Sequence, residues 1–369
     1  MPSSENRVIV ACAGSGKTTR LVRESLADPS RRVALVTYTN SNAREIASKF
    51  HHLNSGVPSH VDVTTWFGFL LRECSRPYQR SKYAEKRIGS MAFVNSRSMK
   101  GVPESDTSRY YFASPGQIFS DKIAQFVTEC EAASSGAVLA RLEGIYTDIF
   151  IDEFQDLAGW DLEVMRLFLE SSIRVTLVGD PRQFIYATNP SAKNRQYRGT
   201  RIVDLVEKWE KAALCAVESM KETHRCGKAV CAFTNGLWPG MDTMEPAQDQ
   251  DESHEHVGVL VVAKSHVMDY VARFEPQVLR HDKRTKTAGC SARNFGQAKG
   301  LEFDRVLIFP TGPITEYLRS GDLKCVEKAK NRLHVAVTRA RRSVAFVFDG
   351  ESAFVPDRWE PASGSDFHS

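Results

Sequence analysis

Two adjacent carboxylates, Asp152 and Glu153, stand at the end of an apolar run in the segment YTDIFIDEFQDL, residues 146–157. The run is rich in β-branched and aromatic residues, as expected of a strand that is buried on both faces of a sheet. In open α/β sheets, ligands bind in the crevice beyond the carboxyl ends of the strands. Because charges at such a place need a partner, this pair predicts a metal ion held over a phosphate group.

A second segment, ACAGSGKTT at residues 11–19, has the composition of a phosphate-binding loop between a strand and a helix. Its small residues let backbone N–H groups turn toward phosphate oxygens, and the following helix adds the positive end of its dipole. We expect Lys17 to reach the β and γ phosphates and the Thr18 hydroxyl to bind Mg²⁺. A plain glycine turn is the alternative. The predicted nucleotide-binding residues of this loop are Ala13, Gly14, Ser15, Gly16, Lys17, Thr18 and Thr19.

Together the two segments predict a site for ATP and Mg²⁺. Asp152 would hold the metal ion with Thr18. Glu153, which is ionised near neutral pH at its ordinary pKa, would orient and deprotonate the attacking water. An exposed acidic strand end is the alternative interpretation of the carboxylates, and the nearby phosphate loop disfavours it.

The elements that must position these groups alternate between strand-like and helix-like runs, which is the pattern of parallel α/β sheets. The alternation restarts after residue 210, so we expect two such domains, 1–210 and 211–355. Residues 76–130 form a polar, irregular block that we expect to be a small inserted subdomain. The acidic segment 246–256 is expected to be a surface loop, and residues 356–369 a flexible tail.

Composition sets wide limits on the function. With 49 Lys and Arg against 45 Asp and Glu, the net charge of +4 permits nucleic acid binding without requiring it. No apolar run reaches the length of a membrane span, and the N-terminus lacks the features of a secretory signal. We therefore expect a cytoplasmic protein without a membrane partner.

Six segments in a fixed order resemble the motifs of the UvrD, PcrA and Rep group of superfamily 1 DNA helicases. They are AGSGKT (13–18), TYTNSNAREI (37–46), DEFQD (152–156), GDPRQFIY (179–186), QAKGLEFD (297–304) and VAVTRARR (335–342). The resemblance spans residues 8 to about 345. It implies two RecA-like domains with a nucleotide cleft between them, and a motor that hydrolyses ATP while moving 3′ to 5′ along single-stranded DNA.

The resemblance also implies roles for single residues. Gln183 would touch the γ phosphate and report its state to the nucleic acid path through Tyr186. Arg225, in ETHRC, and Arg339 would spread the charge of the transferring phosphoryl group. The alternative interpretation is that the basic residues of the segment 339–342 form a solvated helix face. They would then have no role in catalysis. The second domain would also contact the nucleotide, with His224 over the base and Glu302 on the ribose. The implied nucleotide contacts from this domain are His224, Gly300 and Glu302. The implied catalytic residues are Lys17, Glu153, Gln183, Arg225 and Arg339.

A path for single-stranded nucleic acid needs aromatic platforms and phosphate contacts. Tyr38 stands where the family has a stacking aromatic, and Thr64 and Thr65 resemble its phosphate-contacting segment, with Trp66 adjacent. Trp66 is equally well explained as a core residue. After Tyr186 a loop is inserted, and we expect Tyr197, with Arg198 beside it, to replace the family's tryptophan platform; an ordinary turn is the alternative.

Two functions remain open from the sequence. The first is an ATP-dependent translocase or helicase acting on single-stranded DNA, on a tailed duplex or on RNA. The stretch from Arg225 to Gly300 is too short for the accessory domain of these helicases, which makes translocation a firmer expectation than unwinding. The second function is therefore a nucleic-acid-sensing ATPase subunit that regulates a partner nuclease without productive unwinding, by analogy with compact UvrD-like proteins of the Gabija antiviral kind.

Overall fold

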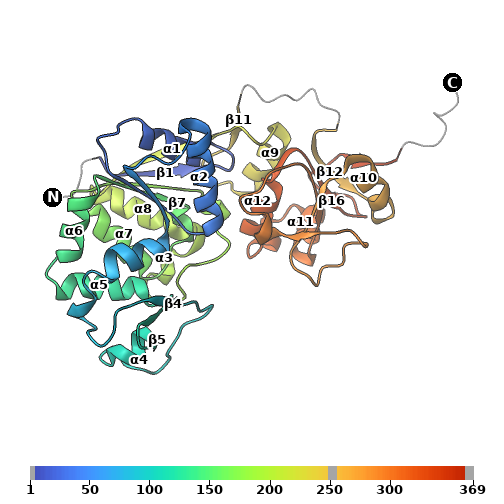
Figure 1. The fold of residues 1–369 in the computed structure, drawn as a ribbon. Coiled ribbons are helices and arrows are strands. Elements are labelled where there is room, and N and C mark those ends of the chain that lie inside the picture. The colour runs from blue at the N-terminus through green and yellow to red at the C-terminus, as the bar shows by residue number, and fades with distance from the viewer. Residues whose placement is uncertain (1–4, 248–255, 362–369) are drawn as a thin grey trace, which may run out of the picture. The chain divides into compact units, whose positions relative to one another are not determined.

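The computed structural model describes residues 5–247 and 256–361, and the contacts between residues divide the chain into two units (Figure 1). The first unit comprises the chain up to Ser219 apart from Cys12–Gly16. These five residues group with the rest of the chain in the second unit. None of the helices within the two described ranges combines the length and the apolar character that crossing a membrane requires.

The first unit contains a six-stranded sheet with the order β3-β2-β7-β8-β1-β9. The strands from β3 to β1 pair in parallel, and every residue of the central strands β2 and β7 is buried. This explains why the interior of each strand, VALV in β2 and IFI in β7, is apolar. The strands are β1 (Arg7–Ala11), β2 (Val33–Thr37), β3 (Val61–Thr65), β7 (Asp148–Asp152), β8 (Arg174–Gly179) and β9 (Ala216–Met220).

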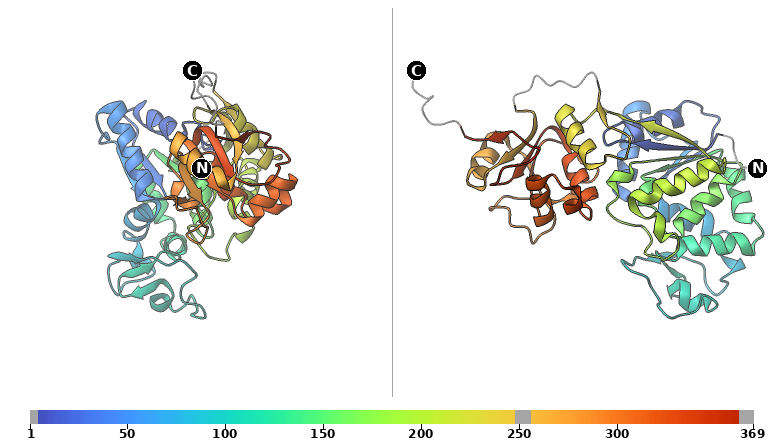
Figure 2. Two further views of the ribbon diagram at one scale, coloured as in Figure 1. Left: turned by 90° about the vertical axis from the view of Figure 1, so that its right-hand side faces the viewer. Right: turned by 180° about the vertical axis from the view of Figure 1, so that it is seen from behind.

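Helices cover both faces of this sheet. Helix α2 lies in front of it in Figure 1, and the yellow-green helix α8 lies in front when the unit is seen from behind in Figure 2. An apolar cluster that includes Phe69, Phe126 and Phe168 joins the helices to the strands. The helices are α1 (Lys17–Leu26), α2 (Asn40–Asn54), α3 (Trp66–Phe69), a π-helix (Leu70–Ser75), α5 (Ile123–Ala133), α6 (Ala137–Ile145), α7 (Asp161–Leu169) and α8 (Ile202–Lys211).

The block at 76–130 contains a small sheet of its own, with β6 between β4 and β5. Its aromatic residues supply the packing, since the rings of Tyr83 and Phe112 stack with centroids 4.0 Å apart and Phe112 meets Phe126 of α5. The elements are β4 (Ser90–Ala92), α4 (Thr107–Tyr111), β5 (Phe112–Ser114) and β6 (Gln117–Phe119).

The second unit contains another six-stranded sheet, in the order β14-β13-β15-β16-β12-β17, in which all pairs are parallel. Its core lies between the sheet and α9, α11 and α12. The strands are β12 (Gly258–Val262), β13 (Gln277–Arg280), β14 (Arg293–Asn294), β15 (Phe303–Phe309), β16 (Ala340–Val347) and β17 (Arg358–Trp359), and the helices are α9 (Lys228–Leu237), α10 (Val267–Phe274), α11 (Gly312–Ser320) and α12 (Lys330–Val337). A separate two-stranded sheet is formed by the short strands β10 (Glu222–Thr223) and β11 (Glu245–Pro246).

Two parallel α/β sheets confirm the fold class expected from the sequence, and three local expectations need correction. The run at 213–219, expected after a boundary at residue 210, forms β9 at the edge of the first sheet. Arg341 and Arg342 belong to β16 and not to a helix face, because α12 ends at Val337. In the expected tail, Arg358–Trp359 pairs with β12; residues 362–369, and 248–255 of the acidic loop, lie outside the described residues.

Candidate functional site

The phosphate loop follows β1 and ends at the start of α1. Gly14 and Gly16 both have φ of 77°, a left-handed conformation that side chains disfavour. A Cβ on Gly14 would also lie 2.6 Å from Cβ of Arg225, and the Gly14 carbonyl accepts a hydrogen bond from the His224 N–H at 3.0 Å. Ser15 is buried, and its hydroxyl has no hydrogen-bond partner among the described residues. The loop therefore requires glycine for reasons of geometry and keeps a polar group unsatisfied.

The residues after the loop meet the two carboxylates of β7. Lys17 Nζ lies 3.0 Å from Glu153 Oε1, and the Thr18 hydroxyl donates to Asp152 Oδ2 at 3.0 Å. Both contacts arise because β1 and β7 flank β8 in the parallel sheet, so that their carboxyl ends reach the same edge. The structure thus brings together the four residues that the sequence assigned to phosphate binding (Lys17), metal binding (Thr18 and Asp152) and activation of water (Glu153).

Burial and charge oppose each other in this cluster. Burial raises the pKa of Asp152 to about 6; the neighbouring Glu153 adds to the rise, and Lys17 opposes it. Burial lowers the pKa of Lys17, but the carboxylates of Glu153 and Asp152 outweigh it, so the net pKa of the lysine is raised. Lys17 is therefore a permanent cation that holds two buried acids together.

Glu153 itself is held in an unusual backbone conformation, with φ of 61° and ψ of 38°. A non-glycine residue in this left-handed region is strained and is often found at functional sites. Its carboxylate accepts a hydrogen bond from the side-chain amide of Gln155, which is fully buried. Gln155 in turn packs against Gly179 at the end of β8, where a Cβ would lie only 2.0 Å from Gln155 Oε1. The expected catalytic base is thus oriented by a side chain that only glycine at 179 accommodates.

Gln183 lies in the short helical turn Pro181–Gln183 that follows β8. It is buried, and its side-chain amide donates to Asp180 Oδ2 at 3.0 Å. Asp180 also accepts from Arg182 Nε at 2.8 Å. The predicted sensor residue is therefore fixed by a buried carboxylate at the same edge of the sheet as Asp152.

The oxygen groups at this edge fit Mg²⁺ and a triphosphate. No group of three or more His, Cys, Asp or Glu in the described ranges could hold a metal ion by itself. Mg²⁺ is commonly bound through one or two protein oxygens, with substrate phosphates and water completing its shell. Asp152 and Thr18 supply that donor set, and the unsatisfied Ser15 hydroxyl and glycine backbone of the loop suit phosphate oxygens.

In the second unit, Arg225 is tied to neighbouring residues of the predicted site. It pairs with Glu302, and its Nη1 donates to the Thr338 carbonyl at 3.2 Å. Glu302 also accepts from Arg341 at 3.0 Å, so the carboxylate expected on the ribose holds two arginines. His224 is exposed, with Nε2 3.7 Å from Glu222. The roles of these residues toward a nucleotide stay predictions, as does that of Gly300, which has φ of 83°.

Arg339 is 2% exposed, and its side chain makes hydrogen bonds within the second unit. Its guanidinium donates to the carbonyls of Val335 and Leu301, at 3.0 and 3.2 Å, and to the Thr338 hydroxyl. The bond to Val335 satisfies one of the last carbonyls of α12, which have no partner within the helix, and the bond to Leu301 ties the end of the helix to the segment before β15. No pattern in the sequence indicated this structural role, and the expected catalytic role of Arg339 stays a prediction.

An aromatic row follows the carboxyl ends of β2 and β3. The ring of Tyr38 lies 5.9 Å from that of Phe67, which lies 5.7 Å from that of Phe93. Phe93 is 74% exposed, and sequence reasoning missed it. Other aromatic residues of the same block, among them Tyr83 and Phe112, are buried, so no signal in the sequence singled out Phe93.

Trp66 does not belong to this row. Its ring is 1% exposed, packs against Phe168, and donates from Nε1 to Asp161 Oδ1 at 2.9 Å. Of the two interpretations of Trp66, the structure favours the core residue over a nucleic acid contact, because the indole is packed inside the first unit and presents no face to a base. Thr64 is buried, and the Thr65 hydroxyl caps α3 by accepting from the Gly68 N–H.

The expected platform after the inserted loop is partly available. Tyr186 is 59% exposed. Tyr197 is half-buried, and its hydroxyl accepts a hydrogen bond from Lys208, which also lies over the ring. Arg198 donates to the carbonyls of Asn189 and Ser191 and so closes the loop on itself. A nucleic acid contact by these three residues stays a prediction.

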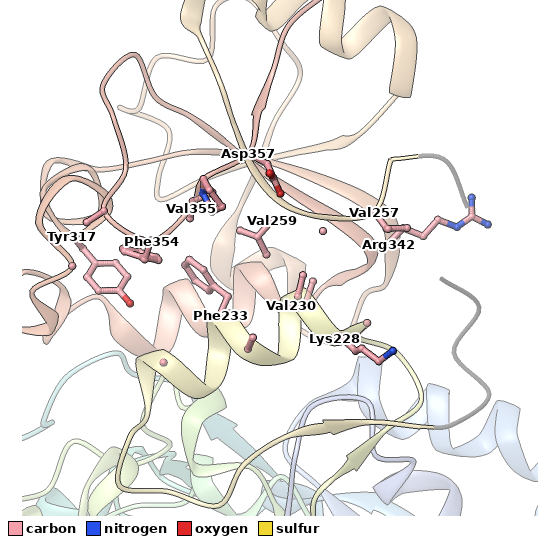
Figure 3. A pocket seen from close by; sticks show the side chains of 18 of the residues that line it. Lys228, Val230, Phe233, Val257, Val259, Tyr317, Arg342, Phe354, Val355 and Asp357 are labelled. Carbon is pink, nitrogen blue, oxygen red and sulfur yellow. The ribbon is translucent and has the colours of Figure 1, made fainter. Parts of the chain in front are cut away.

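A cavity of about 840 Å³ lies in the second unit, beside α9 and the start of β12. Figure 3 shows the rings of Phe233, Tyr317 and Phe354 at one end of it and Lys228 and Arg342 at the other. None of the candidate nucleotide or nucleic acid residues lines this cavity. It is therefore separate from the set of residues described above.

Comparison with known proteins identifies two family models. The UvrD/REP helicase N-terminal domain matches residues 70–195, and the viral superfamily 1 RNA helicase core domain matches residues 136–348, which is more than half of the chain. The chain is also 26% identical over 195 residues to Gabija protein GajB of Bacillus cereus (strain VD045), covering 49% of this chain and 38% of that protein.

Similar solved structures include arterivirus nonstructural protein 10 (helicase), alone and in a complex with DNA, and the PRRSV helicase. Sequence identities are 18%, 18% and 16%, and TM-scores are 0.46, 0.47 and 0.44. The alignments cover 93%, 94% and 93% of this chain but 60%, 61% and 52% of those chains, so this chain spans less than two thirds of each relative. On the match of the core-domain family over residues 136–348, the chain belongs to the superfamily 1 helicases, a family of ATPases that bind nucleic acid.

Proposed function

We propose that this protein is an ATP-dependent translocase or helicase that moves along single-stranded DNA, 3′ to 5′ by family resemblance. The contacts of Lys17 with Glu153 and of Thr18 with Asp152 carry this proposal. A phosphate loop facing two buried acids is the arrangement that nucleoside triphosphate hydrolysis requires. The cytoplasm is the location that we propose for this activity.

The chain's own residues divide the chemistry between them. Lys17 would bind the β and γ phosphates, and Asp152 with Thr18 would hold Mg²⁺, which when bound neutralises charge on the phosphates. Glu153, oriented by Gln155, would take the proton of the attacking water. Arg225 and Arg339 would contribute positive charge from the second unit, and such an arginine is worth about 10³ to 10⁵ in rate in other nucleotide hydrolases.

Two substitutions test the assignment of the nucleotide site. Lys17→Ala should lose nucleotide binding, whereas Glu153→Gln should bind ATP and single-stranded DNA but fail to hydrolyse ATP. The measurements are ATPase activity with and without single-stranded DNA, and equilibrium binding of a labelled ATP analogue. Normal hydrolysis by Glu153→Gln would show that another group acts as the base.

The similarity to Gabija protein GajB favours a second candidate function. In this second function, the chain is an ATPase subunit that senses nucleic acid and regulates a partner nuclease in antiviral defence, without productive unwinding. Displacement of a labelled strand from a tailed duplex separates the two. ATPase activity stimulated by DNA or RNA without displacement would support the second candidate, and a comparison of DNA with RNA strands identifies the substrate.

A further inference from the structure

A pocket of about 520 Å³ in the first unit is lined mainly by cations. The charged residues of its wall are Arg72, Arg76, Arg80, Lys86, Arg87 and Arg141, against the single carboxylate of Glu85. The whole chain has a formal net charge of only +4. The pocket therefore gathers positive charge that the composition does not reveal.

Two of these arginines are neutralised by neighbouring acids. Arg72 Nε donates to Glu73 Oε1 at 2.6 Å, and both terminal nitrogens of Arg141 donate to Glu73 Oε2 at 3.0 Å. Arg72 also pairs with Asp62. Counting Glu73 and Asp62 with Glu85, the six cations face three carboxylates, which leaves three positive charges in excess.

The wall that carries the other cations is held in place by hydrogen bonds between side chains and the backbone. Arg76 donates to the carbonyls of Ile88 and Gly89, each at 2.7 Å. Gln79 is 5% exposed; its amide donates to the Lys86 carbonyl and accepts from the Ile88 N–H, both at 2.9 Å. The segment that bears the free cations is thus preorganised and does not depend on a ligand for its shape.

Four of the six cations have no carboxylate of the described residues within ion-pair distance. Arg76 is hydrogen-bonded to backbone carbonyls, whereas Arg80, Lys86 and Arg87 are exposed. Like charges gathered in a concave site repel one another and raise the local concentration of anions. The cluster therefore has the electrostatics of an anion-binding site.

The lining indicates which anion the pocket suits. Guanidinium groups present pairs of N–H donors that match the oxygens of phosphate. None of the described residues that line the pocket is aromatic, so bases have no surface on which to stack. We propose that this pocket binds the phosphodiester backbone of nucleic acid, as a second contact outside the strand path expected from the helicase motifs.

The pocket is not part of the nucleotide site. Its Arg72 pairs with Asp62, the second residue of β3, and the Tyr146 hydroxyl, just before β7, donates to the same carboxylate. These groups mark the amino ends of the strands. The nucleotide residues follow the carboxyl ends of β1, β7 and β8, at the opposite edge of the sheet.

The inference rests on the proposed function, and a salt titration tests it separately. The triple variant Arg80→Ala/Lys86→Ala/Arg87→Ala removes only side chains that are exposed and unpaired. Its affinity for a labelled duplex with a single-stranded tail is measured by fluorescence anisotropy without nucleotide over a series of salt concentrations. Each lost phosphate contact changes the slope of log K against log salt by about 0.7 to 0.9, so we expect a slope smaller by about 2 to 3 and an affinity at low salt at least about tenfold weaker.

A matched control removes three exposed cations elsewhere, Arg23→Ala/Lys211→Ala/Arg284→Ala, with the same loss of charge. It should keep the wild-type slope, and both triple variants should keep the ATPase activity measured without nucleic acid. Equal slopes for the two variants would overturn the proposal.

Two further outcomes have distinct meanings. If inorganic phosphate raises the melting temperature of the wild type but not of the pocket variant, while the slopes are equal, the pocket takes a free anion and the assignment to nucleic acid is wrong. If the wild type and the control bind no nucleic acid, the proposed function itself fails.

Discussion

The substitution Gly179→Ala tests how the expected catalytic base is oriented. The new Cβ would lie 2.0 Å from Gln155 Oε1 and 2.9 Å from Phe154 Cδ1. Both neighbours are fully buried, so the methyl group has no free space to enter. Gly179 does not have a left-handed φ, and the effect therefore arises from contact and not from backbone strain.

The size of the effect follows from the displacement that the methyl group forces. Non-bonded carbon and oxygen atoms rarely approach within 3.0 Å, so Gln155 must move by about 1 Å, and overpacking of this kind costs about 1 to 3 kcal/mol of stability. The same movement takes the Gln155 amide away from Glu153. Misplacement of a catalytic group by about 1 Å lowers the rate by roughly 10²-fold, and we expect kcat to fall by one to two orders of magnitude.

The assay combines urea unfolding with steady-state ATPase kinetics. Gly144→Ala is the control, because this glycine lies in α6, a Cβ added to it would meet no neighbouring group within 4 Å, and the helix should gain up to about 1 kcal/mol from the higher propensity of alanine. The double variant Gln155→Ala/Gly179→Ala relieves the clash. Its loss of unfolding free energy should be smaller than the sum of the losses of the two single variants by about 0.5 to 3 kcal/mol, and its activity should not recover. Additive single effects, or a kcat equal to that of Gly144→Ala, would refute the reasoning.

Burial raises the pKa of Asp161 to about 6, so the folded state holds its proton more tightly than the unfolded state, and the contribution of Asp161 to stability falls as pH rises from about 4 to 6. This fall is the contribution of Asp161 alone, so it is measured as a difference between variant and wild type. In urea titrations across this window, Asp161→Asn should gain up to about 3 kcal/mol relative to the wild type, and a constant difference would contradict this. Phe93→Ala should weaken single-strand binding by about 1 to 3 kcal/mol in anisotropy measurements, while Leu53→Ala, also exposed, should not. Tyr197→Ala should weaken the same binding at fixed salt; unchanged affinity would exclude it as a platform. Arg339→Lys should lower the free energy of unfolding by about 1.5 to 3 kcal/mol, because an ammonium cannot reach both carbonyls and the hydroxyl; a melting temperature equal to that of the wild type would count against the role described.

The sequence by itself predicted two parallel α/β sheets and the residue types that gather at the carboxyl ends of the strands in the first one. The interior of a strand that is buried on both faces is apolar, so VALV of β2 and IFI of β7 were visible as such runs. A phosphate loop and an acidic strand end are local patterns, because the backbone conformation and the polar atoms come from neighbouring residues. For the same reason Lys17, Thr18, Asp152 and Glu153 could be assigned from their segments alone.

Only the tertiary structure decided which side chains are buried and which remain free. Trp66 is adjacent in sequence to residues expected to contact single-stranded nucleic acid, but its indole is buried against Asp161, 95 positions away in the chain. Phe93 is as apolar as any core residue and is nevertheless exposed. The clash that reserves position 179 for glycine likewise involves Gln155, from a different strand end. Contacts between residues far apart in the sequence depend on the packing of whole elements, and no local pattern encodes them.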